Sequence, residues 1–412
     1  MNYIDLFAGA GGLSEGFIKA GFNPIAHVEM DEAACYTLKT RAAYHHLKGK
    51  KSKDYLTYLK GEIDRNELYS LIPKEEMDSV INLALGDENN KEIFNKIDIQ
   101  LQNKDVDLII GGPPCQAYSL VGRARSDDGM KSDPRNHLYL QYAKFLKRYS
   151  PKVFVFENVL GLRSAGEGNY FKKMVETFNK LGYEVTDFIF NANDFGVLQN
   201  RRRVILIGYK KELNLIIPDF KLKSGTKYLV ESIFNDLPKI NAGEGIDKYC
   251  NYASATNKYL QESEIRNGID ILTQHISRPH TEQDKEIYRI AIESWKEKER
   301  LNYKDLPKRL KTHKNVESFF DRFKVVADNL NYSQTVVAHI AKDGHYYIHP
   351  DIEQNRSITV REAARLQSFA DNFYFEGVKE GRNRTAAFKQ IGNAVPPLMA
   401  FEIAKTIKKA LC

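Results

Sequence analysis

An apolar run that stops at paired glycines and prolines constrains this chain more than any other stretch. Residues 106–110 (Val-Asp-Leu-Ile-Ile) are typical of a buried parallel strand, and Gly-Gly-Pro-Pro-Cys follows at 111–115. The glycines allow a sharp turn, and the prolines stiffen the segment that carries Cys115. Open α/β folds bind ligands at the carboxyl ends of their strands, so the thiol would lie at that edge. A lone cysteine can be a small buried hydrophobe, but packing requires no Pro-Pro turn, and we interpret Cys115 as a nucleophile.

Composition places the chain among ordinary globular proteins. Its 412 residues suffice for two domains, and 42% are hydrophobic against 28% charged. The net charge of +7 permits a nucleic-acid partner without requiring one. The four cysteines lie far apart with no metal-ligand spacing, which favours a reducing compartment and no metal site. With neither a signal-peptide pattern nor a long apolar span, the sequence predicts a cytoplasmic protein without a membrane partner.

The amino-terminal residues predict the opening unit of a nucleotide-binding sheet. A short strand at 3–7 meets a glycine-rich turn at 8–12, and a helix follows. The dinucleotide fingerprint requires a third glycine where Ser14 stands, so the turn is a weak phosphate site but still lets a bulky ligand approach the backbone. A second strand at 24–28 ends at Glu29. An acidic residue about 20 positions after such a turn is where α/β folds bind a ribose, which makes Glu29 the candidate for that role.

Two further segments place charged side chains at strand ends. The apolar residues 153–156 are followed by Glu157 and Asn158, which puts a carboxyl group at the catalytic edge of the sheet. Three consecutive arginines at 201–203 open the apolar strand 204–209. Alternation along a strand puts the first and third of them on one face and the second on the other. A buried ion pair is the alternative role for Glu157, and a solvated strand edge is the alternative for the arginines.

The residues Gly-Pro-Pro-Cys-Gln-Ala-Tyr-Ser at 112–119 resemble the catalytic motif of the cytosine-C5 DNA methyltransferases of bacterial restriction-modification systems. The other motifs of this family occur in the expected order, at residues 157–159, 199–203, 356–367 and 390–397. The resemblance therefore covers both ends of the chain. Only the middle, about 215–330, lies mostly outside it.

This resemblance implies a doubly wound, mostly parallel α/β sheet of the Rossmann-like methyltransferase type with a smaller inserted domain. We expect a catalytic domain over 1–212, a target-recognition domain over 213–385, and a C-terminal segment, 386–412, that returns to the catalytic domain. Within the motif that braces the recognition domain, Thr359 is a natural N-cap for a helix through Gln367.

The resemblance also implies an activity: transfer of a methyl group from S-adenosyl-L-methionine to carbon 5 of a cytosine flipped out of double-stranded DNA. Carbon 5 is a poor nucleophile, and addition of a thiolate to carbon 6 makes it enamine-like. Cys115 would supply the thiolate, and Glu157 would be the acid near ring nitrogen 3. Arg203 would hold the cytosine carbonyl, and Arg201 a phosphate or the region of Glu157. Asn158 would orient either that carboxyl group or the adjacent loop.

By the same match, S-adenosyl-L-methionine would bind at the glycine turn. Phe7 would lie against the adenine ring, although a strand-end Phe can also be a core aromatic. Met30 would be a soft apolar contact beside the adenine, and Asn393 would lie near the methionine part. Asp87 would lie near the adenine amino group, with a plain turn as the alternative. The complete expected set is Phe7, Gly9, Gly11, Gly12, Leu13, Glu29, Met30, Asp87, Pro113, Asn393 and Val395.

DNA contacts are expected mainly in the stretch past Cys115. Residues 120–136 are rich in Gly, Ser, Asp and Arg without a hydrophobic period, which predicts a loop, and the family closes this loop over DNA. An ordinary solvated loop is the alternative for Arg123 and Arg125. The expected contacts are Gln116, Ser119, Arg123 and Arg135.

The middle of the chain carries no comparable chemistry. His275 and His280 have no cysteine or histidine pair at ligand spacing, so a turn or a nucleic-acid contact is favoured over zinc. A helix is expected near 282–299. Residues 296–324 contain ten Lys or Arg against five Asp or Glu, which suits phosphate contact or a solvated helix face. We therefore expect residues of about 213–355 to choose the DNA sequence.

The expected partner is double-stranded DNA, with a companion restriction endonuclease acting on the same site and with the enzyme as a monomer. Two alternatives share the motifs: a tRNA cytosine-5 methyltransferase and a catalytically silent DNA-binding relative. The long middle region favours duplex readout over tRNA, and the intact set of Cys115, Glu157 and Arg203 argues against a silent relative. A methyl-transfer assay on DNA and on tRNA would separate the three.

Overall fold

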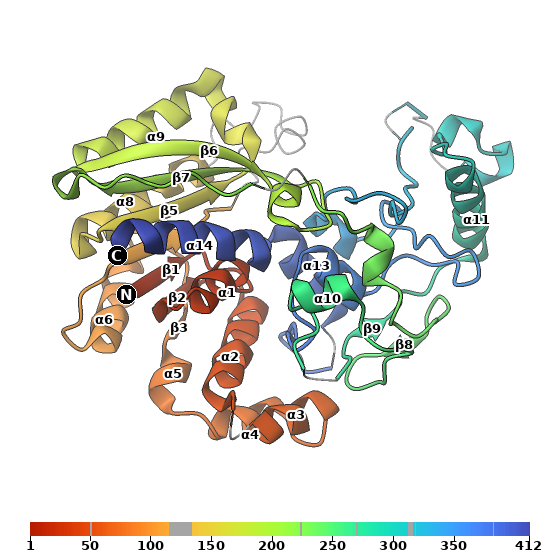
Figure 1. Cartoon of the computed structure of the whole chain (residues 1–412), viewed down its shortest axis with the longest axis horizontal. Coiled ribbons are helices and arrows are strands. Elements are labelled where there is room, and N and C mark those ends of the chain that lie inside the picture. The colour runs from red at the N-terminus through yellow and green to blue at the C-terminus, as the bar shows by residue number, and fades with distance from the viewer. Residues whose placement is uncertain are drawn as a thin grey trace.

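A seven-stranded sheet forms one half of the molecule (Figure 1), in the order β3-β2-β1-β4-β5-β7-β6. The computed structural model describes residues 1–49, 52–114, 134–222, 225–268, 271–311, 316–317, 319–381 and 383–412. Strands β1 to β5 run parallel, and β7 is antiparallel to both of its neighbours. The strands are β1 Asn2–Leu6, β2 Asn23–Glu29, β3 Val80–Asn82, β4 Leu108–Gly111, β5 Val153–Asn158, β6 Tyr183–Asn191 and β7 Arg202–Lys210.

Helices cover both faces of the sheet, as a doubly wound fold requires. One face is buried under α6 (Asn90–Leu101), α8 (Leu138–Tyr149) and α9 (Asn169–Lys180). The other is buried under α1 (Gly12–Lys19) and α14 (Pro397–Leu411), so the two ends of the chain pack in one cluster. The apolar runs of the parallel strands are fully buried because both faces are covered. The predicted fold class is confirmed.

Four helices after β2 form a clamp between the two halves: α2 Glu32–Leu47, α3 Ser52–Lys60, α4 Arg65–Ser70 and α5 Lys74–Asp78. The Tyr55 hydroxyl donates to the carbonyl of Asn372 at 2.8 Å, and Arg65 Nη1 donates to the carbonyl of Gly377 at 2.7 Å. Each contact joins residues more than 300 positions apart. Residues 44–80, rich in Lys, Tyr and Glu, predict only a helical insertion without chemistry, because nothing local in the sequence points to so distant a partner.

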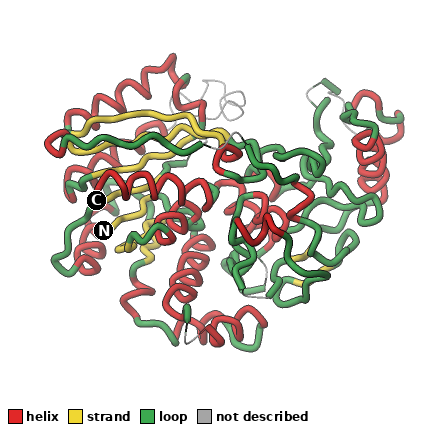
Figure 2. The backbone as a smooth tube through the Cα atoms, viewed as in Figure 1, coloured by secondary structure: helices red, strands yellow, loops and turns green. Residues whose placement is uncertain are grey.

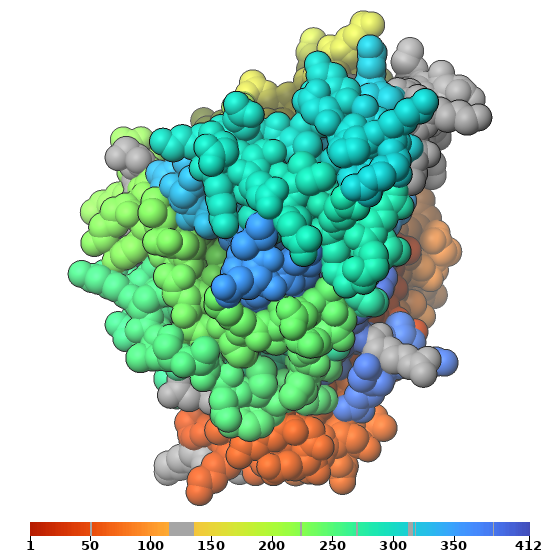
Figure 3. All heavy atoms as spheres, turned by 90° about the vertical axis from the view of Figure 1, so that its right-hand side faces the viewer, coloured from red at the N-terminus to blue at the C-terminus, as the bar shows by residue number. Residues whose placement is uncertain are grey.

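The other half, from about residue 213 to the end of α13, is called the recognition half here after its expected role. It contains little regular structure, and Figure 2 shows it mainly as loop. Its helices are α10 Lys258–Glu262, α11 Glu282–Lys296, α12 Val360–Leu366 and α13 Arg384–Asn393, with one small ribbon of β8 Gly245–Ile246 and β9 His275–Ile276. In Figure 3 the blue chain near residue 350 lies between a green segment below it and a teal segment above it, and Lys239 pairs there with Asp351 at 3.1 Å.

Short 3-10 turns occur along the whole chain, at Pro134–His137, Leu160–Arg163, Ala165–Gly168, Ala192–Phe195, Lys211–Leu213, Val230–Ile233, Tyr303–Asp305, Lys308–Leu310 and Ala338–Ala341.

Helices α13 and α14 pack in different hydrophobic clusters. Helix α13 packs its buried Phe388 and Ile391 in the same hydrophobic cluster as Ala363 and Leu366 of α12. Helix α14 is the element whose apolar face rejoins the sheet. We therefore propose that the C-terminal part of the catalytic domain begins near Pro397.

Helix α12 braces the recognition half through buried arginines. Its predicted N-cap is confirmed: Thr359 and Glu362 form a reciprocal capping box. Arg365 is fully buried and binds two carboxylates, with Nη1 2.6 Å from Asp236 Oδ1 and Nη2 2.5 Å from Asp371 Oδ2. Burial alone would raise the pKa of Asp371, but Arg365 outweighs it and the pKa is lowered. One side chain thus ties together segments that lie 135 residues apart, from 236 to 371.

Replacing Arg365 with methionine should lower the free energy of unfolding by about 3–5 kcal/mol, because two buried carboxylates lose their common partner. Urea denaturation at pH 7 measures this change. The exposed Arg289 of α11, changed to methionine, is the matched control and should shift stability by less than about 0.5 kcal/mol. The difference from wild type should narrow in acid, because a lowered pKa contributes stability only above the pH at which Asp371 is protonated. An unchanged midpoint at pH 7 would contradict the bracing role.

Candidate active site

Four strand ends converge at one edge of the sheet. The register pairs Leu6 of β1 with Gly111 of β4, and Gly111 with Phe156 of β5, so the parallel strands end together. Strand β7 runs the opposite way and therefore begins at this edge, with Ile205 opposite Glu157. The glycine turn, the Pro-Pro turn, the acidic strand end and the arginines are thereby neighbours.

Glu157 and Arg203 form the central pair of this edge. Arg203 Nε lies 2.7 Å from Glu157 Oε1, and the two side chains are only 11% and 13% exposed. Arg203 Nη1 also donates to the carbonyl of Arg202 at 2.9 Å, which fixes the plane of the guanidinium. The carboxyl group reaches the Pro-Pro turn, since a Cβ at Gly112 would stand 2.6 Å from Glu157 Oε2. Only glycine permits this approach, so the turn and the carboxyl group are held in contact.

Asn158 positions the turn that leads to Cys115. It is fully buried, and its Nδ2 donates to the carbonyl of Pro113 at 3.2 Å. Its Oδ1 accepts from the backbone N–H of Val159 at 2.9 Å, which sets the orientation of the amide. The sequence left open whether Asn158 orients the Glu157 carboxyl group or the adjacent loop. The hydrogen bond to Pro113 is a contact with the loop.

Several expected residues fall where the structure gives no description. Cys115, Gln116, Ser119, Arg123 and Arg125 lie outside the described residues, as does the side chain of Arg135. Their roles stay predictions. What the structure does show is the support on both sides of Cys115: Pro113 and Pro114 before it, and α8 after the gap.

Arg201 corrects one expectation. Its side chain is fully buried, and it donates to the carbonyls of Val336 at 2.8 Å and Gly392 at 3.1 Å. A guanidinium enclosed in this way does not reach a DNA phosphate. Gln199, for which the sequence suggested no role, accepts from the backbone N–H of Val336 at 2.9 Å. Arg201 and Gln199 therefore join β7 to the recognition half, while Arg203 faces the site.

The glycine turn leaves open space at Gly9, beside the end of β2. Glu29 accepts from the backbone N–H groups of Gly9 and Asp31, each at 2.8 Å, and burial raises the pKa of Glu29 despite both bonds. A Cβ at Gly9 would meet nothing within 4 Å, so the space above the turn is open. Met30 is 65% exposed at the rim, and Phe7 adopts a positive φ of 57° at the end of β1.

The other expected cofactor residues divide into two groups. Gly12, Leu13 and Val395 are buried in packing between α1 and the chain before α14, where a Cβ at Gly12 would stand 2.4 Å from the Val395 carbonyl. Asn393 is exposed at the end of α13. Asp87 is exposed and forms an ion pair with Lys144 of α8, which lowers its pKa. Gly11 has a positive φ of 83° at the start of α1.

Removing the Glu29 carboxylate should weaken binding of S-adenosyl-L-methionine by about 1–3 kcal/mol, roughly a 5- to 150-fold rise in dissociation constant. Glu29→Ala deletes the carboxylate that binds the backbone N–H of Gly9, beside the open space at that glycine. Titration calorimetry measures the affinity, and the exposed Glu32→Ala on the next helix is the matched control. Unchanged affinity in Glu29→Ala would move the ribose contact elsewhere.

Neither a metal centre nor a membrane span is found in the described part of the chain. No three His, Cys, Asp or Glu side chains there gather as metal ligands. His275 is buried between the Thr359 hydroxyl and the Pro238 carbonyl, so it is a packing residue and not a nucleic-acid contact. None of the described helices is long and apolar enough to cross a membrane.

Known proteins resemble this chain over its whole length. A model of the C-5 cytosine-specific DNA methylase family matches residues 1–66 and 75–409. The type II methyltransferase M.Bpa9945I of Bacillus paralicheniformis is 42% identical over 100% of this chain and 99% of its own. M.DdeI of Desulfomicrobium norvegicum, another type II methyltransferase, is 33% identical over 99% and 88%.

Solved structures agree in fold. An E. coli prophage protein described as a DNA modification methyltransferase superposes with a TM-score of 0.64 at 24% identity, over 100% of this chain and 99% of that chain. The match to a DNA-specific family leaves the tRNA alternative with less support. The chain belongs to the C-5 cytosine-specific DNA methylase family and is a DNA cytosine-5 methyltransferase.

Proposed function

We propose that the enzyme transfers the methyl group of S-adenosyl-L-methionine to a cytosine flipped out of a specific double-stranded sequence, through a covalent bond to Cys115. The observation that carries this proposal is the Glu157–Arg203 pair, held against Gly112 on the turn that leads directly to Cys115. A nucleophile, an acid and a cation are thus supplied from three adjacent strands.

The proposed chemistry assigns one task to each group. The Cys115 thiolate adds to carbon 6 of the cytosine, and the ring electrons move towards carbon 5 while Glu157 delivers a proton to nitrogen 3. Arg203 holds the Glu157 carboxyl group at 2.7 Å and offers its remaining N–H groups to the cytosine carbonyl. After the methyl group has been added to carbon 5, the carbon 5 proton passes to solvent, Cys115 leaves as the thiolate, and the Glu157 carboxylate takes back the proton from nitrogen 3, which restores the ring.

S-adenosyl-L-methionine, which supplies an electrophilic methyl group when bound, would occupy the open space at Gly9 beside Glu29. Glu29 would accept a hydrogen bond from the ribose with a lone pair not used by Gly9 or Asp31. Met30 and Phe7 would border the adenine, since both end strands beside the open space. The exposed Asn393 would approach the methionine part from α13.

Two relatives, M.Bpa9945I and M.DdeI, are named type II methyltransferases. We therefore propose that this enzyme is the modification partner of a restriction endonuclease with the same target, acting as a monomer in the cytoplasm. The described residues of about 213–355 would choose that target.

A covalent trap tests the function. Bisulfite sequencing of DNA from cells that express the enzyme would first identify the target sequence. A duplex with 5-fluorocytosine at that position should then form an adduct that survives denaturation, because fluorine cannot leave carbon 5 as a proton does. The same duplex with ordinary cytosine is the control. An adduct with tRNA and none with DNA would overturn the proposed substrate.

A further inference from the structure

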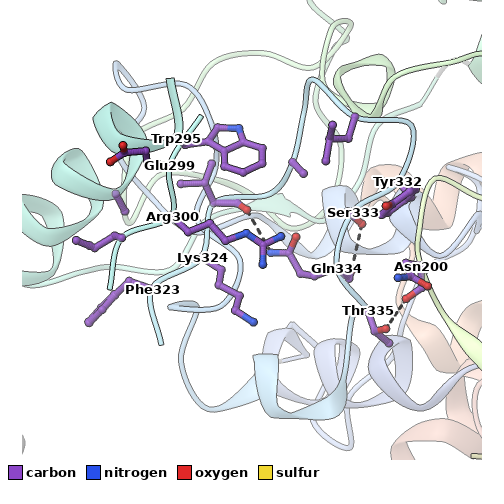
Figure 4. A pocket seen from close by; sticks show the side chains of 15 residues that line it. Asn200, Trp295, Glu299, Arg300, Phe323, Lys324, Tyr332, Ser333, Gln334 and Thr335 are labelled. Carbon is purple, nitrogen blue, oxygen red and sulfur yellow. Dashed lines mark hydrogen bonds between the residues drawn. The ribbon is translucent and has the colours of Figure 1, made fainter. Parts of the chain in front are cut away.

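A cavity of about 320 Å³ lies in the recognition half, between the end of α11 and the segment 323–335 (Figure 4). Its principal lining side chains are Asn200, Trp295, Arg300, Lys324, Tyr332 and Gln334.

One end of this cavity is attached to the catalytic strand. The backbone N–H of Asn200 donates to the Ser333 carbonyl at 2.9 Å, and the Thr335 hydroxyl donates to the Asn200 carbonyl at 2.5 Å. Arg203 follows Asn200 by three residues, a chain length of at most about 11 Å. DNA whose target cytosine is held at Arg203 would therefore bring its neighbouring nucleotides to the cavity.

The cavity offers positive donors to its ligand. Arg300 and Lys324 extend from the same side of the cavity, opposite residues 332–335, whereas the carboxylate of Glu299 points away (Figure 4). Lys324 is paired with Asp321. No described carboxylate lies within ion-pair distance of Arg300, so among the described groups its guanidinium is the cation available for a ligand.

The walls are aromatic and partly fixed. The Trp295 ring is held by its Nε1, which donates to Asp328 Oδ1 at 3.0 Å, and Tyr332 is 41% exposed at the opposite side. A phosphate group needs hydrogen-bond donors but no aromatic rings beside it. A base can use both, because its edge accepts hydrogen bonds and its flat shape packs beside aromatic rings. Arginine donors fit a base that presents two acceptors side by side, and in the major groove guanine does so with O6 and N7.

We propose that this cavity reads one guanine of the recognition sequence, with Arg300 donating to its O6 and N7 and with Trp295 and Tyr332 bordering the base. The proposal rests on the proposed function and names part of its specificity. Asn200 links this readout to the strand that carries Arg203, so a correct base and a correctly placed arginine are coupled through one short segment.

The test compares the purified full-length enzyme with Arg300→Gln on a duplex library that is randomised around the target cytosine. Methylated sites are read by bisulfite sequencing, which gives a base preference at every position. Arg300→Gln should reduce the preference for guanine at one position by about tenfold or more and leave the other positions unchanged. Arg289→Gln, which changes an exposed arginine of α11 outside the cavity, should leave the whole profile unchanged.

Calorimetric binding of S-adenosyl-L-methionine should be equal in both variants and in wild type, which shows that the catalytic domain is intact. A uniform loss of methylation on all sequences would indicate a phosphate contact and overturn the proposal, as would an unchanged profile or a relaxed preference for another base. A wild-type enzyme that methylates no DNA would overturn the proposed function and this inference together. An active wild type with an unaltered Arg300→Gln profile would overturn the inference alone.

Discussion

Replacing Cys115 with serine is expected to abolish methyl transfer, to the detection limit of an assay that follows a labelled methyl group into DNA. A hydroxyl group is far harder to ionise than a thiol, and the thiolate is the attacking form. The turn before Cys115 is held by the hydrogen bond from Asn158 to the Pro113 carbonyl. We therefore expect no other nucleophile to move into the place of the lost thiol.

Cys412→Ser is the matched control, because Cys412 is exposed at the end of the chain, far from the catalytic edge in sequence and outside α14. It should retain full activity. The Cys115→Ser variant should still bind S-adenosyl-L-methionine with wild-type affinity, since none of the groups around Glu29 is altered. Substantial methyl transfer by this variant would exclude Cys115 as the nucleophile.

Replacing Glu157 with glutamine should slow methyl transfer by about 10²- to 10⁴-fold, the range for loss of a positioned general acid. Glutamine keeps the size and can donate a hydrogen bond to nitrogen 3, but it cannot deliver a proton. The change also removes the charge that binds Arg203 at 2.7 Å.

Single-turnover kinetics with saturating DNA measures the chemical step. Glu184→Gln, on the exposed face of β6, is the control and should be neutral. Arg203→Gln leaves the acid in place and removes both its ion-pair partner and the proposed contact with the cytosine carbonyl, and it should be less damaging than Glu157→Gln. A rate for Glu157→Gln within a few-fold of wild type would remove Glu157 from the chemistry.

Local signals explain why much of the fold was predictable from the sequence. Fully apolar runs indicated β4 and β5 because parallel strands covered on both faces bury every side chain. The Thr359 cap and the alternation of the three arginines depend only on neighbours within one turn or one strand. In β7 the burial follows that alternation, with Arg202 exposed and Arg203 buried.

Other features depend on partners far away in the sequence. The Glu157–Arg203 pair requires the antiparallel register of β5 and β7, which no strand reveals alone. The burial of Arg201 depends on Val336 and Gly392, 135 and 191 residues away. The helical clamp after β2 contacts residues near 372–377 for the same reason. Such long-range contacts leave no periodicity, cap or turn signal, so sequence reasoning could not have found them.

The double pairing of Arg365 has an evolutionary consequence. Asp236 lies inside the segment that we expect to choose the DNA target, whereas Arg365 and Asp371 lie outside it. A recombination event that exchanges residues 213–355 between two relatives therefore imports one carboxylate and must find the arginine already present in the recipient. Relatives that both have the Asp236–Arg365 ion pair would therefore be able to exchange this segment, and with it the target sequence, without loss of stability. Relatives that lack one partner would produce an unpaired buried charge on exchange.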